Sequence, residues 1–186
     1  MNFLRKHWYD LGGFLSIVVL AYLFICRHNL TNYQLVMWLS VVSLFFHQLE
    51  EYRIAGTFPG MLNIVMYNSK APDRYPLNTN TSLIINVFVG WLFYFLAAIL
   101  AEKAVWLGLA TILISVGNII AHTVLFNVKG KTIYNAGMAT SWFFFCTLCL
   151  FFLFNYLHRT SCNHRRLFNR YSFRNNFKRS WSIEIN

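Results

Sequence analysis

Charged residues are scarce in this sequence. They make up 12% of its 186 residues, against roughly 25% in an average soluble domain. Hydrophobic residues account for 57% and aromatic residues for 19%. A soluble globular domain does not suit this composition, and the apolar residues are spread over several runs rather than gathered in one anchor. The sequence therefore predicts an integral membrane protein that forms a small helical bundle.

Proline is equally rare. The three prolines, Pro59, Pro72 and Pro76, all fall in one polar connection that ends near Asn80. Their clustering predicts a loop. Within this connection, residues 58–66 are apolar enough to lie at the membrane interface or to dip back into the bundle.

The long apolar runs predict an all-α fold, an integral membrane helical bundle of about five transmembrane helices. The runs lie within a transmembrane domain of residues 1–157, at about 8–26, 33–52, 82–101, 105–127 and 134–157. The polar turns after the third and fourth runs are short, so we expect these helices to be antiparallel neighbours.

The four cysteines do not suggest a disulfide framework. Cys146 and Cys149 have Cys-x-x-Cys spacing but lie inside an apolar run, so we expect them to pack as small hydrophobic side chains. Cys26 and Cys162 lie near the predicted membrane boundaries, where lipidation can occur. The sequence also lacks a convincing signal-peptide cleavage site, internal repeats and low-complexity segments.

Acidic residues number six, against sixteen lysines and arginines. Seven of these basic residues lie in a basic, aromatic-containing tail, residues 158–186. A tail tethered to a bilayer meets anionic headgroups first, so we expect it to bind membrane lipids and not nucleic acid. With five spans, the side that carries the tail has more basic residues than the opposite side. The positive-inside rule then predicts a multi-pass protein with its N-terminus out and its C-terminus in.

The second apolar run ends in an ionisable cluster, His47-Gln-Leu-Glu50-Glu51. Such groups cost several kcal/mol in hydrocarbon unless they have a partner, a metal or water. At about 100° per residue, His47, Glu50 and Glu51 can share one face of a helix. The cluster is therefore a candidate functional site.

Other polar residues are predicted to converge on it. The second and fourth spans run in the same direction, so residues near their ends lie at one depth. Asn118 and His122, four residues apart, should also share a helix face. The polar residues predicted to meet in this half of the bundle are His47, Glu50, Glu51, Asn86, Asn118, His122, Tyr134 and Asn135.

These blocks resemble a known family. The pattern His-x-x-Glu-Glu at 47–51 is followed by Phe58-Pro59, by an Asn/His pair at 118 and 122, and by Tyr134-Asn-Ala-Gly-Met-Ala-Thr140. Together they are similar to the HXXEE family of small membrane proteins, over roughly residues 41–140. The resemblance implies that the blocks form one module, and the biochemical function of that family is not settled.

The residue types favour a metal site. Two imidazoles and one or two carboxylates match the ligands of catalytic zinc and of non-haem iron. The candidate metal ligands are His47, Glu50, Glu51 and His122. Catalytic roles are predicted for Glu50, Glu51, Asn118 and Tyr134, and substrate contacts for Asn86 and Asn135. The function predicted is a metal-dependent membrane enzyme, hydrolase or oxidoreductase, acting on a hydrophobic lipid-like small molecule.

Three alternatives use the same residues. A carboxylic acid in apolar surroundings can hold a proton, which suits a metal-free acid/base isomerase on a lipid-like substrate. Glutamates and histidines also form proton or ion sites in transporters, here as a homo-oligomer, or in a sensor subunit. Finally, His47 and Glu51 can simply pair with each other at the end of their helix.

Overall fold

A computed structural model describes residues 2–154 of the chain. The chain divides into two compact units, Met1–Leu150 and Phe151–Asn186, and residues 151–154 of the second unit are helical. All regular structure among the described residues is helical, which confirms the predicted all-α class. The predicted basic tail, residues 158–186, lies outside the described residues.

The first two helices form a hairpin. Helix α1 (Asn2–Cys26) ends in a short turn, η1 (Arg27–Asn29), and α2 (Asn32–Leu49) follows after two residues. The start of α2 is fixed by a capping box in which Thr31 and Gln34 bond each other's backbone amides. Helix α2 continues as a wider π-helical segment, η2 (Glu50–Ile54), so the His-x-x-Glu-Glu motif spans the change in helix type.

The proline-containing connection holds a helix of its own, α3 (Phe58–Tyr67). Asn63 of this helix is fully buried and holds the rest of the connection in place. Its amide nitrogen donates to the carbonyls of Pro72 and Leu77, at 2.7 and 2.8 Å, and its oxygen accepts from the Leu77 amide at 2.8 Å.

A long helical run follows the connection. It comprises α4 (Thr79–Leu83), η3 (Ile84–Trp91) and α5 (Leu92–Leu100). The chain reverses at Ala101, whose φ of 45° stops the helix, and the short turn η4 (Ala101–Ala104) leads into the next run. This second run comprises α6 (Val105–Ile120), the π-helical η5 (Ala121–Leu125) and α7 (Phe126–Gly130).

The last helix starts later than predicted. It begins with α8 (Met138–Thr140) and η6 (Ser141–Cys146) and is helical to the end of the first unit. The prediction that Tyr134 and Asn135 open this helix is wrong, because Gly137 has a φ of 98° and breaks the helical path. Both residues lie in the preceding loop.

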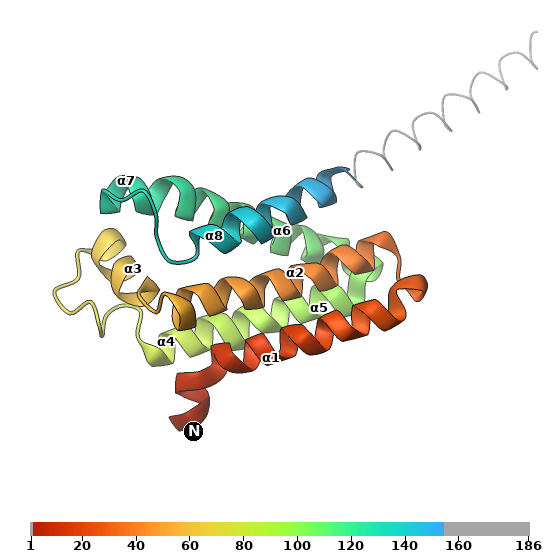
Figure 1. Cartoon of the computed structure of the whole chain (residues 1–186), viewed down its shortest axis with the longest axis horizontal. Helices are drawn as coiled ribbons and strands as arrows, with labels where there is room; N and C mark the ends of the chain where they lie inside the picture. The colour runs from red at the N-terminus through yellow and green to blue at the C-terminus, as the bar shows by residue number, and fades with distance from the viewer. Residues whose placement is uncertain (1, 155–186) are drawn as a thin grey trace, which may run out of the picture. The chain divides into compact units, whose positions relative to one another are not determined.

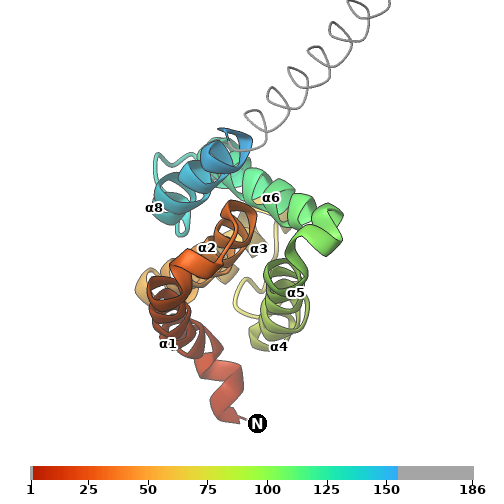
Figure 2. The same cartoon turned by 90° about the vertical axis from the view of Figure 1, so that its right-hand side faces the viewer.

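Helix α2 is the central element of the first unit. It packs against α1, α5, α6 and the α8–η6 helix (Figures 1 and 2). In Figure 2, which looks along the helices, α1 and α5 lie on either side of α2, with α6 and α8 above it. Its side chains are accordingly mostly buried from Val36 to Gln48. The His-x-x-Glu-Glu motif is thus carried by the helix with the most neighbours.

Two segments are long and apolar enough to cross a membrane by length and composition, Phe3–Asn29 and the run Thr79–Gly130, which is folded back at Ala101. The central helix α2 is not among them. Many large apolar side chains on the outer helices are exposed, including Phe14, Phe24, Phe88 and Leu113. Exposed apolar surface on this scale marks an interaction with a membrane or a partner.

Candidate metal centre

His47, Glu51 and His122 meet in the interior. The Oε1 atom of Glu51 lies 3.3 Å from Nε2 of His47 and 3.3 Å from Nε2 of His122. The three potential ligand atoms all lie within 4.8 Å of one another. The residues are 2%, 4% and 0% exposed, so the group is shielded from solvent. Two of its members come from the His-x-x-Glu-Glu motif and the third from η5.

The ring of His122 is oriented by Asn135. Its Nδ1 lies 2.6 Å from the side-chain oxygen of Asn135. The side-chain amide nitrogen of Asn135 donates to the carbonyl of His122 and to the side-chain oxygen of Asn127, both at 2.7 Å. The Asn135 atom that faces Nδ1 of His122 is therefore its side-chain oxygen. Because that oxygen can only accept, Nδ1 of His122 carries the hydrogen. Its Nε2 is then free to act as a ligand.

The ring of His47 is oriented in the same way by Thr140. Its Nδ1 lies 2.9 Å from the Thr140 hydroxyl oxygen. That hydroxyl has a single hydrogen, which it donates to Glu50 Oε2 at 2.5 Å. The oxygen must therefore accept from His47, so Nδ1 of His47 also carries the hydrogen. Both histidines direct an Nε2 toward Glu51.

Glu50 has a different environment from Glu51. Its carboxylate accepts from the Tyr134 hydroxyl at 2.6 Å and from the Thr140 hydroxyl at 2.5 Å. It also accepts from the backbone amides of Ala139 and Thr140, at 3.2 and 2.7 Å. These amides belong to the first turn of the last helix, so Glu50 caps that helix from another part of the chain. Every acceptor position of Glu50 is in use.

The arrangement leaves three lone pairs facing each other. Neither Nε2 of His47 nor Nε2 of His122 makes a hydrogen bond of acceptable geometry, although both are buried. Two unprotonated nitrogens and a carboxylate oxygen repel one another at this distance unless a positive charge lies among them. That charge is either a metal ion or one or more added protons.

Gly137 leaves the space that the group needs. A Cβ at this position would lie 2.5 Å from Cε1 of His122, 2.8 Å from Cε1 of His47 and 3.0 Å from Cγ of Glu51. Its φ of 98° is also strained for any residue with a side chain. Only glycine fits here without displacing the two imidazoles.

Aromatic rings surround the group. Phe58, in the apolar part of the proline-containing connection, lies against His122 with ring centroids 5.6 Å apart. Phe126 contacts His122 at 5.0 Å, and Phe145 contacts His47 at 4.8 Å. The expectation that residues 58–66 dip back into the bundle is confirmed for Phe58. These rings exclude water and so strengthen electrostatic interactions inside the site.

Asn118 does not reach this group. Its amide donates to the Ile114 carbonyl of its own helix at 3.0 Å. On a regular α-helix Asn118 would share a face with His122, four residues on. The π-helical segment η5, which starts at Ala121, has more residues per turn and changes the direction of His122. The predicted placement of Asn118 in the site is therefore corrected.

Asn86 also lies in another network. Its oxygen accepts from Gln48 Nε2 at 3.0 Å, and its nitrogen donates to the Tyr52 hydroxyl at 3.1 Å and to the Ser82 carbonyl at 2.9 Å. Trp91 Nε1 donates to the Gln48 oxygen at 2.7 Å. Gln48 and His47 are adjacent, so their side chains leave α2 in different directions. Asn86 contacts the former and not the latter, which corrects its predicted place in the site.

Two other predicted residues contact the residues around the metal centre and are not themselves among its candidate ligands. Tyr134 contacts Glu50, and Asn135 contacts His122. Glu50, predicted as a ligand, is not in the group of ligand atoms found among the described residues. Gly137 and Thr140 also belong to the site, although neither was predicted from the sequence to have a role in it. Both stand in the same short block as Tyr134 and Asn135, which is the only signal in the sequence that points to them.

A family model described as "Protein of unknown function with HXXEE motif" matches residues 38–152. The chain belongs to the HXXEE family. The match includes all three members of the buried group and the whole 134–140 block, so the resemblance seen in the sequence is confirmed. No curated protein and no solved structure matches the chain.

Proposed function

We propose that this HXXEE protein is a membrane-embedded metalloenzyme, of hydrolase or oxidoreductase type, that acts on a hydrophobic lipid-like molecule. His47, Glu51 and His122 would bind one divalent transition metal, zinc or iron. The observation that carries the proposal is the convergence of two hydrogen-bond-oriented Nε2 atoms and one carboxylate oxygen within 4.8 Å, with no hydrogen bond between them.

The donor set supports a catalytic rather than a structural ion. Structural zinc sites have four protein ligands, whereas catalytic zinc and non-haem iron sites often have three and keep positions open for substrate. Here three ligands converge, and Gly137 keeps a side chain out of the space beside them. A bound metal would supply Lewis-acid polarisation of a substrate oxygen.

The chain's own residues would do the rest. Asn135 and Thr140 fix the ring orientations, as second-layer partners of metal-bound histidines do. Glu50 holds Thr140 in place through two hydrogen bonds. Phe58 and Phe126 exclude water and provide apolar surroundings that suit a lipid-like substrate.

The membrane part of the proposal is a five-span topology with the N-terminus out and the C-terminus in. The two long apolar segments support it, and so does the exposed apolar surface of the outer helices. The continuous helix Asn32–Ile54 is roughly 35 Å long at 1.5 Å per residue, which is enough to cross a bilayer core. Its buried position among other helices is where an intramembrane ionisable cluster is tolerated.

A second candidate function is favoured by the 3.3 Å contacts between Glu51 Oε1 and the Nε2 atoms of His47 and His122. If protons supply the positive charge, Glu51 and the two imidazoles form a buried acid/base group instead. The protein would then be a metal-free isomerase on a lipid-like substrate.

Elemental analysis of the full chain, purified in detergent without chelators, separates the two candidates. We expect one transition-metal ion per chain, lost in His47→Ala and in His122→Ala and kept in the control His28→Ala, whose histidine is exposed. If the unmodified protein is folded, with high helix content and cooperative thermal unfolding, and yet contains no metal, the metalloenzyme is refuted and the acid/base candidate is left. Incubation of metal-loaded protein with membrane lipid extract, followed by mass spectrometry, then tests whether it is an enzyme, with Glu51→Gln as the inactive control.

A further inference from the structure

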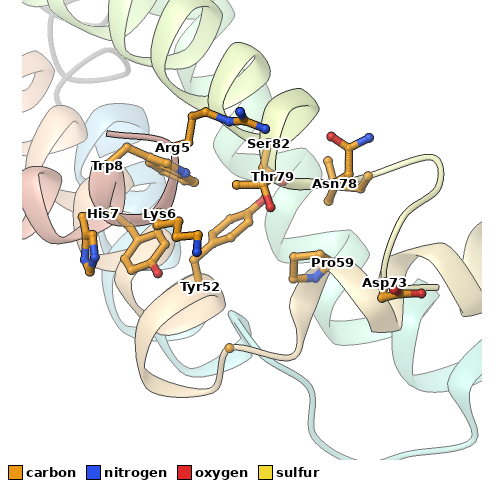
Figure 3. Close-up of a pocket in the computed structure, with 13 residues that line it drawn as sticks. Arg5, Lys6, His7, Trp8, Tyr52, Pro59, Asp73, Asn78, Thr79 and Ser82 are labelled. Carbon is orange, nitrogen blue, oxygen red and sulfur yellow. The ribbon is translucent and has the colours of Figure 1, made fainter. Parts of the chain in front are cut away.

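A cavity of about 430 Å³ lies outside the metal centre (Figure 3). Arg5, Lys6 and His7 line it from the start of α1, and Asn78, Thr79 and Ser82 line it from the start of α4. Figure 3 shows Tyr52 between these two groups. None of the three candidate metal ligands lines the cavity, so it is distinct from the metal centre. Its volume is in the range of small-molecule sites.

The charge of the cavity is positive. Among the described residues, no acidic side chain pairs with Arg5 or Lys6. Asp73, the carboxylate in the lining, is already paired with Arg74 at 3.1 Å, and nearby Asp10 contacts Arg53 and His7. The cavity therefore holds two cationic side chains without a protein counter-ion.

The remaining lining suits a group with several oxygen atoms. Tyr52 and Thr79 contribute hydroxyls, and Arg5 offers a planar set of donors that binds phosphate oxygens in pairs. The helix that begins at Thr79 adds a positive dipole, although Asn78 already accepts from the amides of Asn80 and Thr81. Most of the attraction for an anion therefore comes from Arg5 and Lys6.

Apolar surface adjoins the cavity. Trp8, Tyr9 and Leu77 form part of its wall. Along the same helices, the exposed side chains next to the polar lining are large and apolar, Leu4 beside Arg5 and Ile84 and Ile85 after Ser82. A molecule with an anionic head and an apolar chain would fit a cationic cavity with apolar side chains beside it.

From these observations we propose that the cavity is a binding site for a phosphate group, carried by an acidic lipid headgroup or present as the free anion. Arg5 and Lys6 bind the charge, and the hydroxyls of Tyr52 and Thr79 complete the contacts. The site requires neither the metal nor the reaction proposed above.

The test measures binding of dihexanoyl phosphatidic acid to the full chain in neutral detergent by isothermal titration calorimetry. Dihexanoyl phosphatidylcholine is the zwitterionic reference, and inorganic phosphate is the competitor. We expect phosphatidic acid to bind at least tenfold more tightly than phosphatidylcholine. The double variant Arg5→Gln/Lys6→Gln should lower that affinity at least tenfold, and salt should weaken it.

The matched control is Lys129→Gln/Lys131→Gln, which removes two positive charges outside the cavity lining and should leave the affinity unchanged. Full displacement by inorganic phosphate would assign the site to the free anion, and resistance to displacement would assign it to the lipid headgroup. Equal binding of both lipids, or equal affinity of the two double variants, would overturn the proposal. Metal content is measured in the same samples, so failure here is distinguishable from failure of the metal centre.

Discussion

Glu50 and Glu51 are adjacent in the sequence, but their carboxylates have separate partners. Glu51 faces Nε2 of His47 and of His122 at 3.3 Å. Glu50 accepts four hydrogen bonds from Tyr134 and from residues 139–140. The two glutamates of the motif therefore differ in what they stabilise, and they can be separated by experiment.

Glu51→Gln should abolish stoichiometric metal binding, because it removes the only carboxylate ligand and its charge. We expect the affinity for zinc, measured by competition with a chromophoric chelator, to fall more than ~100-fold. Glu50→Gln is the matched variant. It should keep the metal with an affinity lowered by no more than about tenfold, because Thr140 still accepts from His47 but is held less firmly. It should also lower the free energy of unfolding by about 3 kcal/mol, because charge-assisted hydrogen bonds are lost. Equal metal affinity in the two variants would contradict the assignment of Glu51, and not Glu50, as the metal ligand.

Gly137→Ala should disrupt the metal centre without disturbing distant helices. The added Cβ would contact both imidazoles, and the positive φ adds strain of about 1–3 kcal/mol. We expect loss of bound metal and a lower melting temperature. Gly117→Ala is the control, because no atom lies within 4 Å of its added Cβ, and it should be neutral or slightly stabilising. Normal metal content in Gly137→Ala would be evidence against this site.

Asn135→Ala should weaken metal binding by about 10–100-fold, because His122 loses the acceptor that fixes its Nδ1 hydrogen and its ring orientation. Asn118→Ala removes the same side chain from a position where its amide donates to the Ile114 carbonyl of its own helix, and should change the affinity less than twofold. A larger effect at position 118 than at 135 would restore the prediction made from helix periodicity. Isothermal titration with zinc measures both.

The proposed topology predicts opposite labelling at two exposed lysine positions. In cells expressing the protein, a cysteine at position 131 should react with a membrane-impermeant maleimide from outside. A cysteine at position 103 should react only after lysis. Replacing the four native cysteines, Cys26, Cys146, Cys149 and Cys162, with serine removes background labelling. The reverse pattern would invert the orientation, and labelling of both in intact cells would exclude a single five-span topology.

Composition and periodicity were enough to predict the helical class and the meeting of His47, Glu51 and His122. The ends of the second and fourth helices lie at the same level because successive helices alternate in direction, and this was sufficient for the meeting. Helix periodicity wrongly placed Asn118 beside His122, because π-helical segments change the face of a helix by an amount that the sequence pattern does not reveal. Asn86 was misplaced because depth alone does not say on which side of α2 a partner lies. The roles of Thr140 and Gly137 depend on backbone geometry that no residue spacing predicts.

The link from His47 through Thr140 to Glu50 has a consequence for the order of assembly. Thr140 lies in the last helix of the first unit, about ninety residues after His47. His47 therefore has no fixed ring orientation until that helix has docked and Glu50 has capped it. A metal ion would enter only a completed bundle and would then join the helix that carries His47 and Glu51 to the helix that carries His122. Metal occupancy in a newly synthesised chain would report that assembly has finished.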